Sequence, residues 1–143
     1  MKSKSPKQHK FSRSPCPIAN TLDLVGDKWS LLVVRDLLRG KATYSELVNS
    51  FERIPTNILA DRLRRLEAAG IITSSAYQER PVRYAYTLTE KGAELGDILR
   101  ALVQWGKRHI PGTRTYKEPA SASRTEKASG RATRHAKTGA GTN

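Results

Sequence analysis

Hydrophobic residues in the first third of the chain recur at helical spacing. Ile18, Leu22 and Val25 fall on one face of a segment that ends at Gly26, which predicts an amphipathic helix. A second helix is predicted over the following stretch, WSLLVVRDLLR, which is apolar almost all round. Because such a helix needs apolar neighbours on every side, we expect it to be the buried centre of a small domain.

The next segment has the pattern of two helices joined by a short turn. Residues 43–46, TYSE, form a capping box that predicts the start of a short helix. After a tight turn, residues 55–70 predict a longer helix, in which Leu59, Leu63 and Leu66 form one apolar stripe. A short helix and turn before a longer helix is the arrangement that places the longer one in a DNA major groove.

The hydrophobic period then changes from helical to alternating. Residues 71–77 and 83–88 predict two strands of a hairpin, and a last helix is predicted over residues 89–109. The apolar stripe of that last helix consists of Leu95, Ile98, Leu99, Leu102 and Trp105. The predicted fold class is therefore mainly α with a small β-hairpin (α+β), in the order of a winged helix-turn-helix.

Charge divides the chain into three parts. The 143 residues carry a net charge of +13, and 37% of them are hydrophobic. Residues 1–15 have five basic and no acidic side chains, and residues 111–143 have seven basic and two acidic ones. Both segments lack apolar periodicity, so we expect two disordered basic arms around one domain at residues 16–110. Such arms attract polyanions without reading sequence.

Several other classes of protein find little support in the sequence. An anionic membrane surface is a conceivable partner of the arms, but neither arm has the apolar face of an interfacial helix. The chain lacks a transmembrane-length apolar run and an N-terminal signal region, and it has one cysteine, so we expect a cytoplasmic, nucleoid-associated protein. The three histidines are far apart, and we expect no enzyme activity, metal or cofactor. The sequence identifies no small-molecule effector.

One face of the helix predicted over residues 55–70 carries polar side chains suited to double-stranded DNA. Thr56 and Asn57 lie at its N-terminus, where base contacts are usually made, and Arg64 can pair with guanine. Asp61 either accepts from a cytosine amino group or holds neighbouring arginines in position. Arginine-rich helices are often only solvated faces, but the helix-turn-helix frame and the charged hairpin favour DNA contact. The predicted DNA-contacting residues are Thr43, Tyr44, Thr56, Asn57, Asp61, Arg62, Arg64, Arg65, Arg80 and Arg83.

A series of short motifs runs through the predicted domain: CP at 16–17, DKW at 27–29, YSEL at 44–47, the leucine stripe up to GI at 70–71, YTLTEKG at 86–92 and WG at 105–106. This series resembles the HxlR-type bacterial regulators of the MarR-like superfamily. Each motif alone is weak, but the ordered series over about residues 15–110 is specific. Thr43 stands where the family commonly has Arg, which removes one phosphate contact.

The resemblance implies a dimeric transcription factor, here predicted to be a repressor, that reads a roughly palindromic operator. Its first and last helices would form the dimer. The residues predicted at that interface are Ile18, Leu22, Leu95, Ile98, Leu99, Leu102 and Trp105. The alternative for this apolar stripe is packing within its own domain.

Cys16 precedes Pro17 at the start of the first predicted helix, near Lys10 and Arg13. Helix N-terminal donors and nearby cations both favour a thiolate. Some HxlR-like regulators sense oxidants or electrophiles through a cysteine at this position, which makes Cys16 a candidate redox sensor. The alternative is a small residue packed at the dimer interface.

Two further functions remain open at this point. The chain could be a non-specific nucleic-acid or nucleoid-binding protein that acts through its basic arms, and such binding would fall steeply with salt. A winged helix used only to bind protein is the other.

Overall fold

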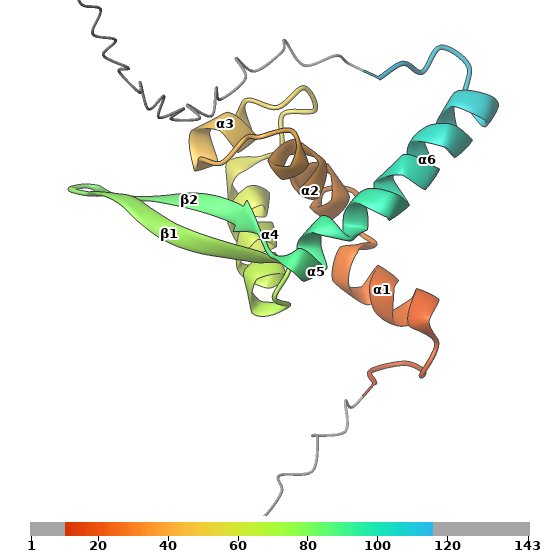
Figure 1. Cartoon of the computed structure of the whole chain (residues 1–143), viewed down its shortest axis with the longest axis horizontal. Coiled ribbons are helices and arrows are strands. Elements are labelled where there is room, and N and C mark those ends of the chain that lie inside the picture. The colour runs from red at the N-terminus through yellow and green to blue at the C-terminus, as the bar shows by residue number, and fades with distance from the viewer. Residues whose placement is uncertain (1–10, 116–143) are drawn as a thin grey trace, which may run out of the picture.

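The computed structural model describes residues 11–115, and it confirms the predicted fold class (Figure 1). Helices and a hairpin follow one another in the predicted order. The elements are α1 (Pro17–Val25), α2 (Ser30–Leu38), α3 (Tyr44–Val48), α4 (Thr56–Ala68), β1 (Ile72–Glu79), β2 (Val82–Leu88), α5 (Glu90–Ala93) and α6 (Leu95–His109). The expected arms lie mostly outside the described residues.

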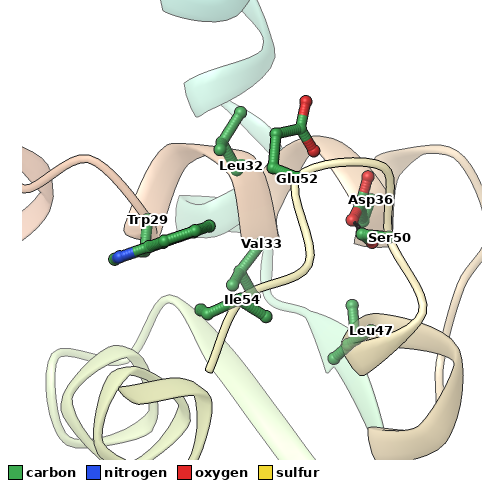
Figure 2. A pocket seen from close by; sticks show the side chains of 8 residues that line it. All are labelled: Trp29, Leu32, Val33, Asp36, Leu47, Ser50, Glu52 and Ile54. Atoms are coloured by element: carbon green, nitrogen blue, oxygen red, sulfur yellow. Dashed lines mark hydrogen bonds between the residues drawn. The ribbon is translucent and has the colours of Figure 1, made fainter. Parts of the chain in front are cut away.

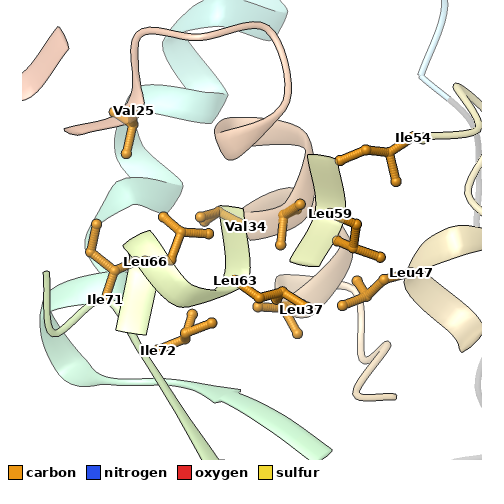
Figure 3. Packing of buried hydrophobic residues seen from close by; sticks show 11 residues of the cluster. Val25, Val34, Leu37, Leu47, Ile54, Leu59, Leu63, Leu66, Ile71 and Ile72 are labelled. Atoms are coloured by element: carbon orange, nitrogen blue, oxygen red, sulfur yellow. The ribbon is translucent and has the colours of Figure 1, made fainter. Parts of the chain in front are cut away.

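One hydrophobic cluster holds these elements together. The predicted stripe of α4, formed by Leu59, Leu63 and Leu66, is fully buried against α2 and the start of β1 (Figure 3). Burying a leucine side chain contributes about 1.5–3 kcal/mol. The complete cluster consists of Val25, Val33, Val34, Leu37, Leu47, Ile54, Leu59, Leu63, Leu66, Ile71 and Ile72.

The helix predicted to be buried on every side is covered except at its end. α2 packs Val33, Val34 and Leu37 into the core, as expected, but Leu38 at its end is exposed. It also buries the carboxylate of Asp36. α2 is therefore the buried central helix that the sequence predicted, except at Leu38, its last residue.

The capping box and the hairpin form as predicted. The Thr43 hydroxyl accepts a hydrogen bond from the backbone N–H of Glu46, whose carboxylate accepts one from the Thr43 N–H at 2.9 Å. β1 and β2 pair antiparallel, with Ile72 opposite Leu88. Thr43 also forms a β-bridge with Ala85, so the hairpin is joined to the segment before α3. The sequence pattern did not predict this link.

The last predicted helix is divided into α5 and α6. Thr89 caps α5 by accepting from the Gly92 N–H, and its hydroxyl donates to the Gly70 carbonyl at 2.6 Å. Gly92 is buried so closely against Ile71, the residue before β1, that a Cβ atom there would lie 2.0 Å from the Ile71 carbonyl oxygen. These contacts anchor the α5 turn, and α6 begins after the single residue Glu94.

The predicted dimer stripe is divided between two environments. Leu95 and Leu99 are half-buried and pack against the domain's own core. The other α6 members of the stripe and the two α1 residues are exposed, with Ile18 at 71% and Trp105 at 56%. α6 extends away from the hairpin, and α1 projects from the body beside its start (Figure 1).

Candidate nucleic-acid interface

The start of α4 is fixed against α3 with its polar residues exposed. The Tyr44 hydroxyl donates to the backbone carbonyl of Thr56 at 2.7 Å. Thr56 and Asn57 are exposed on the first turn of α4, which this hydrogen bond joins to α3. The hydrogen bond from the Thr43 N–H, together with that from Ala42, holds the pKa of Glu46 below its usual value, so the capping box stays ionised at neutral pH.

Asp61 organises the arginines on the exposed face of α4. Its carboxylate lies 3.1 Å from Nε of Arg65 and 3.7 Å from Nη2 of Arg64. The two arginines remain largely exposed, Arg64 at 77% of its side chain. Of the two roles considered for Asp61, the structure supports the holding of Arg64 and Arg65.

Arg62 has a different environment from the one expected. Its side chain is only 20% exposed, and its Nε lies 3.1 Å from Oδ1 of Asp27, without the alignment of a hydrogen bond. A second contact joins its Nη1 to Asp61 at 3.2 Å. Arg62 therefore ties α4 to the start of α2, and its contact with DNA stays a prediction. The sequence pattern could not show that Asp27 lies against this side of α4.

Asp27 also caps the backbone N–H groups at the start of α2. Its Oδ1 accepts from the backbone N–H groups of Trp29 at 2.8 Å and Ser30 at 3.0 Å. Partial burial opposes ionisation of Asp27, but the hydrogen bonds from Ser30 and Trp29 and the charge of Arg62 outweigh it, so the pKa is lowered. The cap is therefore ionised and paired at neutral pH.

A polar network that the sequence pattern did not reveal fixes the turn between α3 and α4. Arg35 on α2 binds both carboxylate oxygens of Glu52 at 2.8 and 2.7 Å, and it donates to Asp36 at 3.0 Å. The buried Asp36 carboxylate accepts from the Ser50 hydroxyl (Figure 2). Lys41 Nζ lies 3.7 Å from the same carboxylate. The hydrogen bond from Arg35 lowers the pKa of Glu52. The cavity beside this network is about 10 Å³, too small for an organic ligand.

The hairpin presents its arginines near its tip. Arg80 and Arg83 are exposed; Arg80 lies in the turn that joins β1 to β2, and Arg83 is the second residue of β2. Thr43 is half-buried and already engaged in the capping box. The exposed predicted contacts are thus found on α4 and at the hairpin tip, at two separate places on the surface.

Cys16 is exposed and immediately precedes α1. Its carbonyl accepts from the backbone N–H of Asn20 at 3.0 Å. The neighbouring cation Arg13 is paired with Asp23 at 2.6 Å, so its charge is balanced by that carboxylate and not by the Cys16 thiol. Lys10 lies outside the described residues.

Residues 11–115 contain neither a candidate metal site nor a candidate membrane-spanning helix. No group of three or more His, Cys, Asp or Glu side chains in this part of the chain is placed to hold a metal ion. No helix within it combines the length and the apolar character that a membrane crossing requires.

The chain combines a short helix, a turn fixed by ion pairs, a longer helix with an exposed polar start, and a flanking hairpin. This arrangement defines the class of winged helix-turn-helix proteins. Within that class, the chain belongs to the HxlR-like helix-turn-helix family, which it matches over residues 24–114. It is a transcriptional regulator of this family.

Relatives and solved structures agree with this assignment. The chain is 40% identical over 91 residues to the HTH-type transcriptional regulator sll1512 of Synechocystis sp., covering 64% of this chain and 67% of the relative. The redox regulator HypR in its oxidized form superposes with a TM-score of 0.60 at 32% identity, covering 71% of this chain and 100% of HypR. The reduced form of the transcriptional regulator YodB from B. subtilis gives 0.58 at 29% identity, covering 69% and 98%.

Proposed function

We propose that this protein is a sequence-specific repressor that binds a pseudo-palindromic operator as a homodimer. The observation that carries the proposal is the exposed first turn of α4, where Thr56 and Asn57 are held outward by the Tyr44 contact. Arg64 and Arg65, oriented by Asp61, supply further base or phosphate contacts on the same helix. A repressor needs only to occupy its operator, so this proposal requires no additional activating surface on the protein.

The exposed part of the apolar stripe supports the dimer. Ile98, Leu102 and Trp105 on α6 and Ile18 and Leu22 on α1 leave more apolar surface in solvent than a monomer usually tolerates. A two-fold dimer through these helices would present two α4 helices to successive half-sites. Leu95 and Leu99 pack against the core of their own domain. In the proposed dimer they would lie beneath the exposed interface residues and support them.

We further propose that residues 16–110 form the DNA-binding and dimerisation domain and that residues 1–15 and 111–143 add affinity for the DNA backbone. The two flanking segments hold most of the net positive charge. Their contribution would be insensitive to base sequence and steeply dependent on salt. A regulator that binds chromosomal DNA would act at the nucleoid in the cytoplasm.

The proposal is tested by fluorescence anisotropy with DNA from upstream of the protein's own gene and with scrambled DNA. Full-length protein and protein lacking residues 112–143 are compared at two salt concentrations. We expect the truncated protein to prefer its own DNA by about a hundredfold or more, and the full chain to bind both DNAs more tightly at low salt. If neither that DNA nor a random-sequence selection yields a preferred site, and truncation abolishes binding, the protein is a non-specific nucleic-acid binder.

A second candidate function is redox sensing through Cys16. It is supported by the exposed thiol and by the similarity of the chain to the redox regulator HypR. Oxidation by diamide would join the Cys16 thiols of two protomers in a disulfide, with two electrons and two protons passing to diamide. We expect diamide to change operator affinity at least about fivefold in the wild type and not in Cys16→Ser. The sensing role is abandoned if Cys16→Ser responds to diamide as the wild type does.

A further inference from the structure

α2 and α6 enclose a wide surface groove on the side of α2 that the core leaves open. Its volume is about 670 Å³, within the range of organic-ligand sites. We call it the α2–α6 groove. Its principal lining residues are Arg35, Leu38, Arg39, Leu99, Arg100 and Lys107.

The groove is cationic. Its lining includes four Arg or Lys side chains and no acidic residue. Arg35 is paired with Glu52, and Arg100 is paired with Asp97 on its own helix. Within residues 11–115, neither Arg39 nor Lys107 has an acidic side chain within ion-pair distance. A concave surface lined by one sign of charge concentrates the electric field, so it attracts anions.

The floor of the groove is apolar. Leu38 is exposed at 44%, Val103 is exposed as well, and Leu99 is half-buried between them and the core. Gly96 keeps the groove open at one end, since its missing side chain leaves Leu38 and Arg100 as the nearest groups. A surface of this kind suits a ligand with an apolar body and one acidic group, since a bare inorganic anion would leave the leucines uncovered.

The flanking segments of the chain are poor occupants. Residues 1–10 contain four lysines and no acid, and residues 116–143 contain six basic and two acidic side chains. Both would be repelled by Arg39 and Lys107. The proposed DNA contacts, in turn, come from α4 and the hairpin and not from the two helices that form the groove.

We propose that the α2–α6 groove binds a small amphipathic organic anion, with Arg39 and Lys107 pairing with its acidic group and Leu38, Leu99 and Val103 covering its apolar body. Arg35 connects this site to the helix-turn-helix, because it lines the groove and also binds both carboxylate oxygens of Glu52 in the turn before α4. An anion near Arg35 competes with Glu52 for the same guanidinium. This regulatory consequence, unlike the binding itself, rests on the proposed DNA-binding function.

The test uses the full-length protein and the probe 8-anilinonaphthalene-1-sulfonate, which has an aromatic body and one sulfonate. Its uncharged counterpart is N-phenyl-1-naphthylamine. By fluorescence titration, we expect Arg39→Gln and Lys107→Gln each to weaken binding of the sulfonate about five- to tenfold and to leave binding of the amine nearly unchanged. Arg108→Gln is the matched control, because it removes the same charge from the adjacent residue of α6, which does not line the groove.

Two outcomes would overturn the site. If Arg39→Gln and Lys107→Gln leave sulfonate binding unchanged, the probe binds elsewhere. If Arg108→Gln weakens it equally, only general charge attraction is involved. Operator affinity is then measured with saturating sulfonate. If it does not change although the groove is occupied, the regulatory link through Arg35 is wrong while the binding site stands; if the protein binds no operator at all, the proposed function fails independently of the site.

Discussion

Leu102→Glu is expected to yield a monomer that binds operator DNA at least about a hundredfold more weakly than the wild type. Leu102 is half-exposed on α6, in line with Ile98 and Trp105, so a glutamate there remains hydrated in the monomer. In the proposed dimer, two carboxylates would be buried among apolar side chains, which costs several kcal/mol per ion. A monomer contacts a single half-site, and a hundredfold loss corresponds to about 2.7 kcal/mol. Sedimentation velocity measures the mass, and anisotropy measures the affinity.

Gln104→Glu is the matched control for this variant. It adds the same charge to the same helix, but Gln104 lies off the apolar stripe and lines the α2–α6 groove instead. We expect it to remain dimeric and to bind operator within about threefold of the wild type. A Leu102→Glu protein that still sediments as a dimer would place the interface somewhere other than α6.

Much of the fold was predictable because each element carries its own local signal. The α4 stripe, the capping box at Thr43 and the hairpin depend on residues a few positions apart, and helical or alternating spacing reveals these directly. The break between α5 and α6 was missed because Thr89 and Gly92 contact residues 70 and 71, just before β1, and these segments are separated along the chain.

The candidate site was predicted less completely, for the same physical reason. Spacing along α4 identified the exposed arginines, but it grouped Arg62 with Arg64 and Arg65 as one set of DNA contacts. Only the tertiary fold brings Asp27 within 3.1 Å of Arg62 and removes it from the exposed face. The ion pair between Arg35 and Glu52 likewise joins residues seventeen positions apart, and the residue pattern of a single helix cannot reveal such a contact.

Gly92→Ala is expected to destabilise the domain by about 3 kcal/mol, which corresponds to a fall in Tm of roughly 10–20 °C. An added Cβ would lie 2.0 Å from the Ile71 carbonyl oxygen and 3.0 Å from Leu88. The nearer of these atoms is backbone, so relief requires moving α5 away from β1 and weakening the Thr89 contacts with Gly70 and Ile71. Thermal and urea unfolding followed by circular dichroism measure the change.

Gly106→Ala separates this steric effect from the ordinary preference of a helix for alanine. Gly106 lies inside α6, and a Cβ there would have no atom within 4 Å. Alanine is favoured over glycine in a helix interior by about 0.5–1 kcal/mol, so this variant should be slightly more stable than the wild type. The opposite signs expected for one substitution at two glycines follow from the close contact at Gly92 alone. A Gly92→Ala protein as stable as the wild type would show that α5 is not pressed against β1, and the origin of the break before α6 would have to be sought elsewhere.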